Sequence, residues 1–291
     1  MNSNIKAIIL DIDGVIIGEK IGVNSPYPNS KVIKALQKLK ADGYLVVACT
    51  GKPFLAIEKI IKNATLYNLH IVDGGATLFD PVNKTPVKIK SIGGERAVPI
   101  IEFFLNNNIY TEFYTQNDYY VQRSQVGIKT EKHSFVLQRN PIVVNNLAKE
   151  AAKHNVIRLM LIADDKTKIN LIQGLFDKNF KNKLNIRWST HPPILPLQFG
   201  IVTAKGISKK EMLYDLLDSY SLSTDDILSI GDSMSDWEFM QISKYVATVE
   251  NADPLLKNLV NSKGKDYSYI GKSVDENGIL DIIKHFKLNN E

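Results

Sequence analysis

Two carboxylates follow a short apolar segment near the start of the chain. Residues 6–10 are almost entirely apolar, which predicts a strand buried in a sheet, and Asp11, Asp13 and Gly14 come directly after it. Because side chains two residues apart on a strand share a face, Asp11 and Asp13 can point into one site. Such a pair suits a divalent cation together with a phosphate group. A turn without chemical function explains the same residues equally well, because Asp and Gly both favour turns.

A second pair of carboxylates occurs late in the chain. Residues 226–230 predict another buried strand, and Asp232 and Asp236 follow it. Ligands of open α/β folds bind outside the carboxyl ends of the strands, where these acids are expected. A hard cation such as Mg²⁺ needs only a few carboxylates besides water and substrate phosphate. Taken alone, Asp232 is equally explained as a turn residue and Asp236 as a helix cap.

Three further residues have the chemistry to bind a phosphate. Thr50 and Gly51 follow the apolar segment 44–49, and the backbone N–H groups of a helix start there can hold a phosphate oxygen. Lys209 lies in the first turn of a helix expected over residues 206–219, where the helix dipole disfavours a cation. Each signal is weak by itself, since Thr-Gly turns and exposed lysines at helix starts are common.

The elements that must position these residues alternate between strand and helix through the first eighty residues. This alternation is typical of a parallel α/β sheet, and it returns after Pro196. The sequence therefore predicts a Rossmann-like parallel sheet. The expected strands are residues 6–10, 44–49, 69–72 and 226–230, and the expected helices are 29–41, 54–63 and 206–219.

The middle of the chain follows a different pattern, with short strands and helices of the α+β type. We expect residues 81–195 to form an inserted domain, and residues 1–80 with 196–291 to form one discontinuous α/β core. The elements expected in the insertion are helices over 94–106, 143–154 and 166–179, and strands over 110–114, 119–123, 156–163 and 184–190.

Composition limits the class of protein. The chain has 291 residues, 44% of them hydrophobic and 23% charged, which is enough for a substantial core and for two domains. The single cysteine, Cys49, excludes an intramolecular disulfide and fits a reducing compartment. The apolar segment before Asp11 is too short and too acidic for a signal peptide or a membrane span. We therefore expect a cytoplasmic protein with no membrane partner.

Positive charge is concentrated in the middle of the chain. The net charge is +5, yet the stretch from Asp80 to Gly200 contains 17 Lys/Arg against 10 Asp/Glu. Long basic runs, zinc-finger spacing and basic stripes with interleaved aromatic residues are all absent from the sequence, so we expect no nucleic-acid partner. A mildly basic middle favours anionic small substrates instead.

The candidate residues, taken in order, resemble the four motifs of the haloacid dehalogenase (HAD) superfamily. The insertion between the second and third motifs resembles the large cap of its Cof-type (IIB) phosphatases, and the resemblance spans nearly the whole chain. Other stretches similar to the family are residues 73–76, 246–252 and 277–279. The four motifs are Asp11-Ile12-Asp13-Gly14, Thr50-Gly51-Lys52-Pro53, Gly206-Ile207-Ser208-Lys209 and Gly231-Asp232-Ser233-Met234-Ser235-Asp236.

The resemblance implies a covalent mechanism. Asp11 would attack phosphorus and form an aspartyl-phosphate, and Asp13 would act as the general acid and then as the general base. Mg²⁺ would be held by the Asp11 carboxylate, the Asp13 carbonyl and Asp232.

The resemblance also assigns the residues around the phosphate. Thr50, Gly51 and Lys209 would bind the phosphoryl group and stabilise the charge of the transition state. Asp236 would not bind the metal directly but would position metal-bound water or Lys209.

Two positions depart from the family pattern. Ser235 replaces a usual Asn, and Asp73 replaces the Asn that usually precedes Gly74. Both replacements can still form hydrogen bonds, so we expect retained chemistry with different hydrogen bonds around the site.

The resemblance implies a Mg²⁺-dependent phosphatase that acts on a small phosphorylated metabolite, with a sugar phosphate the first choice. Two alternatives remain at this point. One is a phosphotransferase similar to the phosphomannomutase branch, and the other is a phospho-ligand-binding protein without catalysis. The sequence predicts neither the substrate nor the oligomeric state, and it does not predict which cap residues contact the leaving group.

Overall fold

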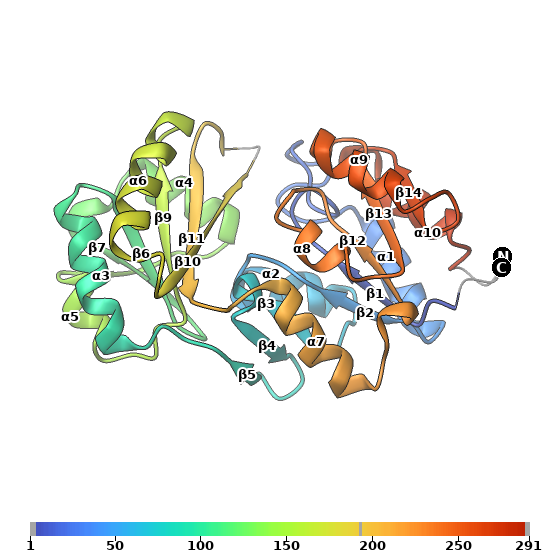
Figure 1. Ribbon diagram of the computed structural model, residues 1–291, viewed down its shortest axis with the longest axis horizontal. Helices are drawn as coiled ribbons and strands as arrows, with labels where there is room; N and C mark the ends of the chain where they lie inside the picture. Colours follow the sequence, from blue (N-terminus) through green and yellow to red (C-terminus); the bar gives the residue numbers. More distant parts are fainter. Residues whose placement is uncertain (1–3, 192–193, 289–291) are drawn as a thin grey trace. The chain divides into compact units, whose positions relative to one another are not determined.

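The computed structural model describes residues 4–191 and 194–288. Its internal contacts divide the chain into two compact units, each with its own sheet (Figure 1). Unit 1 comprises the described residues of Met1–Thr50, Ile57–Val87 and Ser208–Glu291, and unit 2 comprises those of Gly51–Ala56 and Lys88–Ile207.

Unit 1 is built on a five-stranded parallel sheet with the strand order β14-β13-β12-β1-β2. The inner strand β1 is buried along its whole length, which explains its continuous apolar run. Because β12 and β2 flank β1 in parallel, the carboxyl ends of all three strands lie at one edge of the sheet. The strands are β1 (Ala7–Leu10), β2 (Leu45–Ala48), β12 (Ile227–Ile230), β13 (Tyr245–Val249) and β14 (Ser268–Gly271).

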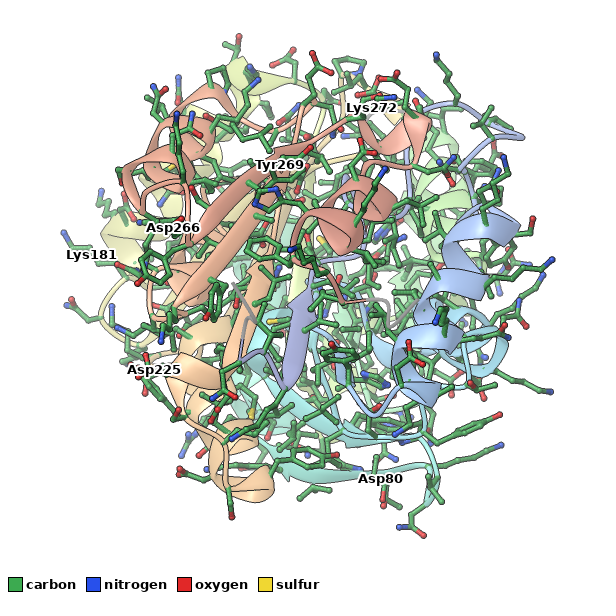
Figure 2. The ribbon with its side chains drawn as sticks, turned by 90° about the vertical axis from the view of Figure 1, so that its right-hand side faces the viewer. Asp80, Lys181, Asp225, Asp266, Tyr269 and Lys272 are labelled. Carbon is green, nitrogen blue, oxygen red and sulfur yellow. The ribbon has the colours of Figure 1, made fainter. Side chains whose placement is uncertain are left out.

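Helices and a small second sheet complete unit 1. Figure 2 shows the face of the molecule on which Tyr269 of β14 lies. The Tyr269 ring stacks on that of His285 at 4.0 Å between ring centroids, which fixes α10 against the edge of the sheet. The helices are α1 (Ser30–Ala41), α2 (Phe54–Asn63) from Ile57 onward, α7 (Lys209–Tyr220), α8 (Trp237–Met240), α9 (Pro254–Ser262) and α10 (Gly278–His285). The antiparallel strands β3 (His70–Val72), β4 (Thr77–Asp80) and β5 (Thr85–Ile89) form the second sheet. This architecture confirms the predicted α/β fold with a parallel-sheet core.

Unit 2 is an α+β domain around a six-stranded sheet with the order β10-β11-β9-β6-β7-β8. Helices α3, α5 and α6 contribute to one buried apolar cluster, and α4 contributes to a second one. The strands are β6 (Tyr110–Tyr114), β7 (Tyr119–Gln122), β8 (Ile142–Val144), β9 (Arg158–Ala163), β10 (Leu184–Thr190) and β11 (Gln198–Ala204). The helices are α3 (Gly94–Asn106), α4 (Ile128–Leu137), α5 (Leu147–Ala151) and α6 (Lys166–Asn179).

Two predicted features of this domain differ from the structure. The helix expected over residues 143–154 is wrong, because strand β8 ends at Val144 and Asn146 then caps the short helix α5 by accepting from Lys149 N–H. The sequence analysis also missed α4. Its buried positions include the polar residues Thr130 and His133, so it lacks the apolar spacing by which helices are recognised.

The division into units also differs from the predicted boundaries at residues 80/81 and 195/196. The contacts place the first boundary after Val87, inside β5, because most of this strand extends the small sheet of β3 and β4. They place the second after Ile207, because β11 pairs with β10 and β9 instead of joining the parallel sheet.

A buried polar cluster anchors α4 to the sheet of unit 2. The Glu112 carboxylate accepts hydrogen bonds from the hydroxyls of Tyr110 and Tyr114, at 2.9 and 2.8 Å, and lies 2.9 Å from Nδ1 of His133. Burial of the two tyrosines raises their pKa values, so both hydroxyls stay protonated as donors. His133 is therefore a buried packing residue of unit 2.

His70 is a buried residue whose protonation should control stability in unit 1. Its Nδ1 accepts from Ala48 N–H at 3.1 Å, so the proton must lie on Nε2, which donates to the Leu66 carbonyl at 2.9 Å. Burial lowers the pKa of His70 from 6.5 to about 4. At His70, the unfolded chain therefore binds one more proton than the folded chain between these two pH values.

We expect protonation of His70 to lower the free energy of unfolding by about 3 kcal/mol as pH decreases from 6.5 to 4. Urea unfolding at several pH values measures this loss. The matched variant His70→Gln should be less stable at pH 7 but should lose less stability over the same interval. Equal pH dependence of the two proteins would contradict this assignment.

Candidate active site

Asp11 lies at the carboxyl end of β1, an inner strand of the parallel sheet of unit 1. Its N–H donates to the Ile230 carbonyl at 2.9 Å, so the pairing of β1 with β12 continues one residue past the strand. The residue is only 8% exposed. Asp13 is half-buried, and the chain then turns at Gly14, whose N–H donates to the Ile17 carbonyl. The two predicted acids are therefore at a strand end, as expected.

Lys209 is a buried partner of Asp11. Its Nζ lies 3.2 Å from Oδ1 of Asp11 and 2.7 Å from Oδ1 of Asp236, and the residue is 8% exposed. Ser208 caps α7 by accepting from Glu211 N–H at 3.1 Å, which fixes the start of the helix that carries the lysine. The alternative of an exposed surface lysine is therefore wrong.

Asp236 holds both Lys209 and the loop after β12. It is fully buried, and its Oδ2 accepts from the N–H groups of Asp232 and Ser233 and from the Ser233 hydroxyl, at 3.2, 3.1 and 2.8 Å. Asp236 stands before α8, but its side chain makes no cap hydrogen bond to that helix. Ser235 joins the same network through a 2.8 Å bond to Ser233. The sequence analysis missed Ser233, although Ser three residues before Asp is a recognisable local hydrogen-bonding pattern.

The acids of this site repel one another. Burial raises the pKa of Asp11 to about 7 against the opposing effect of Lys209, and Asp236 and Asp13 raise it further. Burial also raises the pKa of Asp232 well above its usual value, with Asp236 and Asp11 adding to the effect. For Lys209, burial favours the neutral amine, but the two adjacent carboxylates outweigh it and raise the pKa.

This donor set fits a divalent cation. Carboxylate oxygens of Asp11, Asp232 and Asp236 all lie within 4.8 Å of one another. Both oxygens of Asp236 already accept hydrogen bonds or pair with Lys209, so Asp11 and Asp232 are the carboxylates best placed for an ion. A hard cation with oxygen ligands would relieve the repulsion that raises their pKa values. The contribution of the Asp13 carbonyl stays a prediction.

Gly14 is required by its closeness to Asp232. A Cβ atom at this position would overlap the Asp232 carboxylate, and the residue has a φ of +76°. The backbone after Asp13 therefore packs directly against the second acid-bearing loop.

Thr50 is buried where β2 ends. Its N–H donates to the Ile71 carbonyl at 2.9 Å, and its own carbonyl accepts from Gly74 N–H at 3.1 Å. Asp73, one of the two departures from the family pattern, is buried with a φ of +56°. Gly51 falls in unit 2. Phosphate binding by Thr50 and Gly51 stays a prediction.

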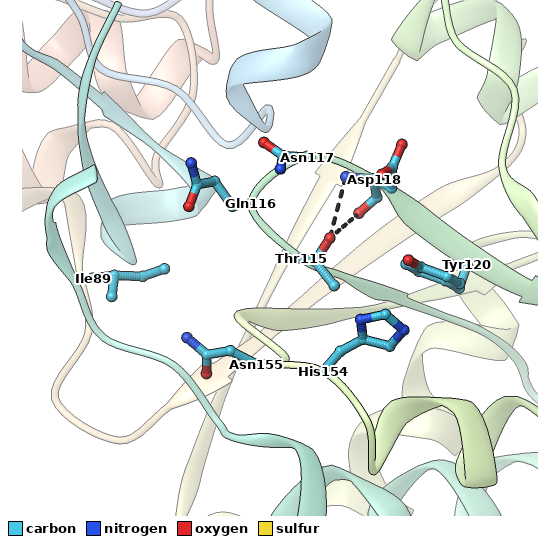
Figure 3. Close-up of a pocket in the computed structure, with 8 residues that line it drawn as sticks. All are labelled: Ile89, Thr115, Gln116, Asn117, Asp118, Tyr120, His154 and Asn155. Atoms are coloured by element: carbon cyan, nitrogen blue, oxygen red, sulfur yellow. Dashed lines mark hydrogen bonds between the residues drawn. The ribbon is translucent and has the colours of Figure 1, made fainter. Parts of the chain in front are cut away.

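A polar cavity of about 340 Å³ lies within unit 2 (Figure 3). Its lining contains none of the predicted site residues, so the candidate site rests on the acids and lysine of unit 1. The lining residues are Ile89, residues 115–118, Tyr120, His154 and Asn155.

Comparison with known families shows which family this chain belongs to. A sequence profile described as haloacid dehalogenase-like hydrolase matches residues 8–283. The chain belongs to this family. The match includes all seven predicted site residues, and it confirms the resemblance and the predicted enzyme class, a phosphatase of the HAD type.

Individual HAD proteins are similar over nearly their whole length. A pyridoxal phosphate phosphatase from Escherichia coli, YbhA, is 24% identical over 265 residues, which cover 88% of this chain and 92% of YbhA. A HAD-like hydrolase from Bacteroides thetaiotaomicron has a TM-score of 0.81 at 18% identity, covering 96% of this chain and 98% of its own. A sugar phosphatase of HAD subclass IIB has a TM-score of 0.76 at 21% identity, covering 97% and 99%.

The structure also bears on a membrane partner. Across residues 4–191 and 194–288, every helix is too short or too polar to cross a membrane. The cytoplasmic location and the absence of a nucleic-acid partner stay predictions.

Proposed function

We propose that the chain is a Mg²⁺-dependent phosphatase that hydrolyses a small phosphate monoester through an aspartyl-phosphate at Asp11. The observation that carries this proposal is the buried Asp11 carboxylate, 3.2 Å from Lys209 Nζ and clustered with Asp232 at one sheet edge. An ionised carboxylate beside a cation can act as a nucleophile on a phosphoryl group, whose negative charge the cation attracts.

The first step transfers the phosphoryl group to the protein. An oxygen of Asp11 attacks phosphorus in line with the ester bond, so a P–O bond to Asp11 forms while the bond to the leaving oxygen breaks. Asp13, protonated at this stage, gives its proton to the leaving alkoxide. Lys209, held by Asp236, stabilises the charge on the phosphoryl oxygens together with Thr50.

The second step regenerates the enzyme. Asp13, now ionised, takes a proton from a water molecule whose oxygen attacks phosphorus. The bond between phosphorus and Asp11 breaks, and inorganic phosphate leaves with the Asp11 carboxylate restored.

The carboxylates of Asp11 and Asp232, with the Asp13 carbonyl, would hold the metal ion. When bound, Mg²⁺ supplies positive charge that offsets the repulsion between a substrate phosphate and the attacking carboxylate. The crowded acids support this role, since their mutual repulsion favours a cation over an empty site.

We further propose that unit 2 selects the substrate and that a sugar phosphate is the first class to test. The excess of Lys/Arg between Asp80 and Gly200 favours an anionic small molecule. Two HAD proteins similar to this chain are named for pyridoxal phosphate and for sugar phosphates, and both names denote small phosphate monoesters.

A panel of phosphate esters, assayed for released phosphate with and without Mg²⁺, tests this function. We expect hydrolysis to stop when EDTA removes the metal and to return with added Mg²⁺. Neither Lys209 nor Thr50 can supply the positive charge of the divalent metal ion. Treatment with EDTA already neutralised by excess Mg²⁺ is the control. Full activity in EDTA would contradict metal dependence.

Product analysis separates the remaining alternatives. Isomerised sugar phosphate with little free phosphate would show phosphotransfer, and ligand binding without turnover would show a sensor. Either result would replace the proposed hydrolysis.

A further inference from the structure

The loop between β13 and α9 contacts both loops that carry the catalytic acids. Asn251 donates from Nδ2 to the Gly14 carbonyl at 3.0 Å, across 237 residues of sequence. Two residues later, Asp253 N–H donates to the Asp232 carbonyl at 2.9 Å. One short segment therefore bonds to the backbone directly after Asp13 and to the backbone of Asp232 itself.

The side chain of Asn251 is held from its other end. Its Oδ1 accepts from Val274 N–H at 2.8 Å. The Val274 carbonyl in turn accepts from the buried side chain of Asn24 at 2.7 Å. The amide of Asn251 is thus oriented at both ends, and its N–H is directed at Gly14.

The loop also begins a regular helix. The Asp253 side chain caps α9 by accepting from Leu255 N–H at 2.8 Å, and Pro254 occupies the first helical position. These features fix the backbone of Asp253, and so they fix the donor that reaches Asp232.

The contact at Gly14 has a direct geometric consequence. Gly14 packs so closely on the Asp232 carboxylate that no side chain fits between them. A displacement of the Gly14 peptide would therefore change the separation between Asp13 and Asp232. Asn251 itself is exposed and so adds little to a buried core. Its contribution to the structure is the pair of hydrogen bonds to the Gly14 carbonyl and from Val274 N–H.

We propose that Asn251 is a positioning residue that sets the separation of the Asp13 and Asp232 loops through the Gly14 carbonyl. This inference rests on the proposed function, in which those loops bind the metal and move the proton. A displacement of the Asp13 and Asp232 side chains would reduce the rate of the chemical step more than it would reduce substrate binding.

Two variants separate the two hydrogen bonds. Asn251→Ala removes both, whereas Asn251→Asp keeps an acceptor for Val274 N–H and loses the donor to Gly14. We expect kcat to fall about 10- to 100-fold in both variants, with KM little changed. We also expect the dissociation constant for Mg²⁺, measured by calorimetry with the metal alone, to rise about 10-fold.

The added charge of Asn251→Asp strengthens this test. A further carboxylate near the acids would by itself attract Mg²⁺, so weaker binding in this variant has to come from misplaced ligands. The matched control is Asn179→Ala in α6, where an exposed Asn also donates to a backbone carbonyl, that of Leu175, at 2.8 Å. All three variants should keep Tm within about 2 °C of the unaltered protein.

The outcomes decide the inference separately from the function. If the unaltered protein hydrolyses esters and both Asn251 variants keep its kcat and its Mg²⁺ affinity, the inference is wrong while the function stands. A lowered Tm with unchanged kcat would reduce Asn251 to a structural role and overturn it equally. If no ester is hydrolysed, the proposed function fails, and the Mg²⁺ titration alone decides whether Asn251 positions the two loops.

Discussion

The Asp11→Asn variant is expected to release no measurable phosphate from any ester that the unaltered protein hydrolyses. An amide oxygen is not a nucleophile toward phosphorus, and the substitution also removes one carboxylate from the proposed metal site. Loss of a covalent nucleophile reduces kcat by about 10⁴-fold or more. Steady-state phosphate release with excess Mg²⁺ measures this change.

This variant should remain folded. Burial raises the pKa of Asp11 to about 7, which means that burying the ionised carboxylate costs free energy in the folded state. A neutral amide of the same size does not carry this cost of burying a charge. Thermal unfolding should therefore give a Tm no lower than that of the unaltered protein.

Asp226→Asn is the matched control. Asp226 is also buried but lies before β12, where it pairs with Lys6 at 2.8 Å, at the end of the strand opposite to Asp232. We expect this variant to lose stability and to keep its kcat. Comparable kcat for Asp11→Asn and the unaltered protein would overturn the assignment of the nucleophile.

The Lys209→Met variant is expected to lose both activity and stability. Methionine fills a similar volume but leaves the buried carboxylates of Asp11 and Asp236 without their cation. Removal of one partner from a buried ion pair costs about 3 to 5 kcal/mol. Removal of one group that stabilises transition-state charge lowers kcat by about 10²- to 10³-fold.

Urea unfolding and phosphate release measure the two losses. Lys210→Met, at the next position of α7, is the control, because Lys210 lies outside the acid cluster and should tolerate the change. Adding Asp236→Asn to Lys209→Met should recover part of the lost stability, since it removes one uncompensated charge. Unchanged stability in Lys209→Met would show that the ion pair contributes little in solution.

The local parts of the fold were predictable from sequence because they depend on local spacing. The helix over residues 94–106 and the buried strand at the start of the chain match the structure closely, since apolar periodicity directly reflects which face is buried. The same reasoning failed for α4, which buries Thr130 and His133 against Glu112 in unit 2. Polar burial depends on a partner far along the chain, so local spacing does not reveal it.

The sequence by itself indicated the family and the candidate residues of the site. Two pairs of carboxylates after strands, a Thr-Gly turn and a lysine at a helix start occur in the order of the HAD motifs, and the family match confirms that reading. The opening pair, Asp11 and Asp13, was ambiguous alone because turns and sites use the same residues.

Only the tertiary structure decided how these residues are held. It buries Lys209 between Asp11 and Asp236, engages both oxygens of Asp236, and places Asn251 against the Gly14 carbonyl. Each contact joins segments that are distant in sequence. Their distances and burial, and hence their pKa values, follow from how strands and helices pack, which residue types and local spacing do not specify.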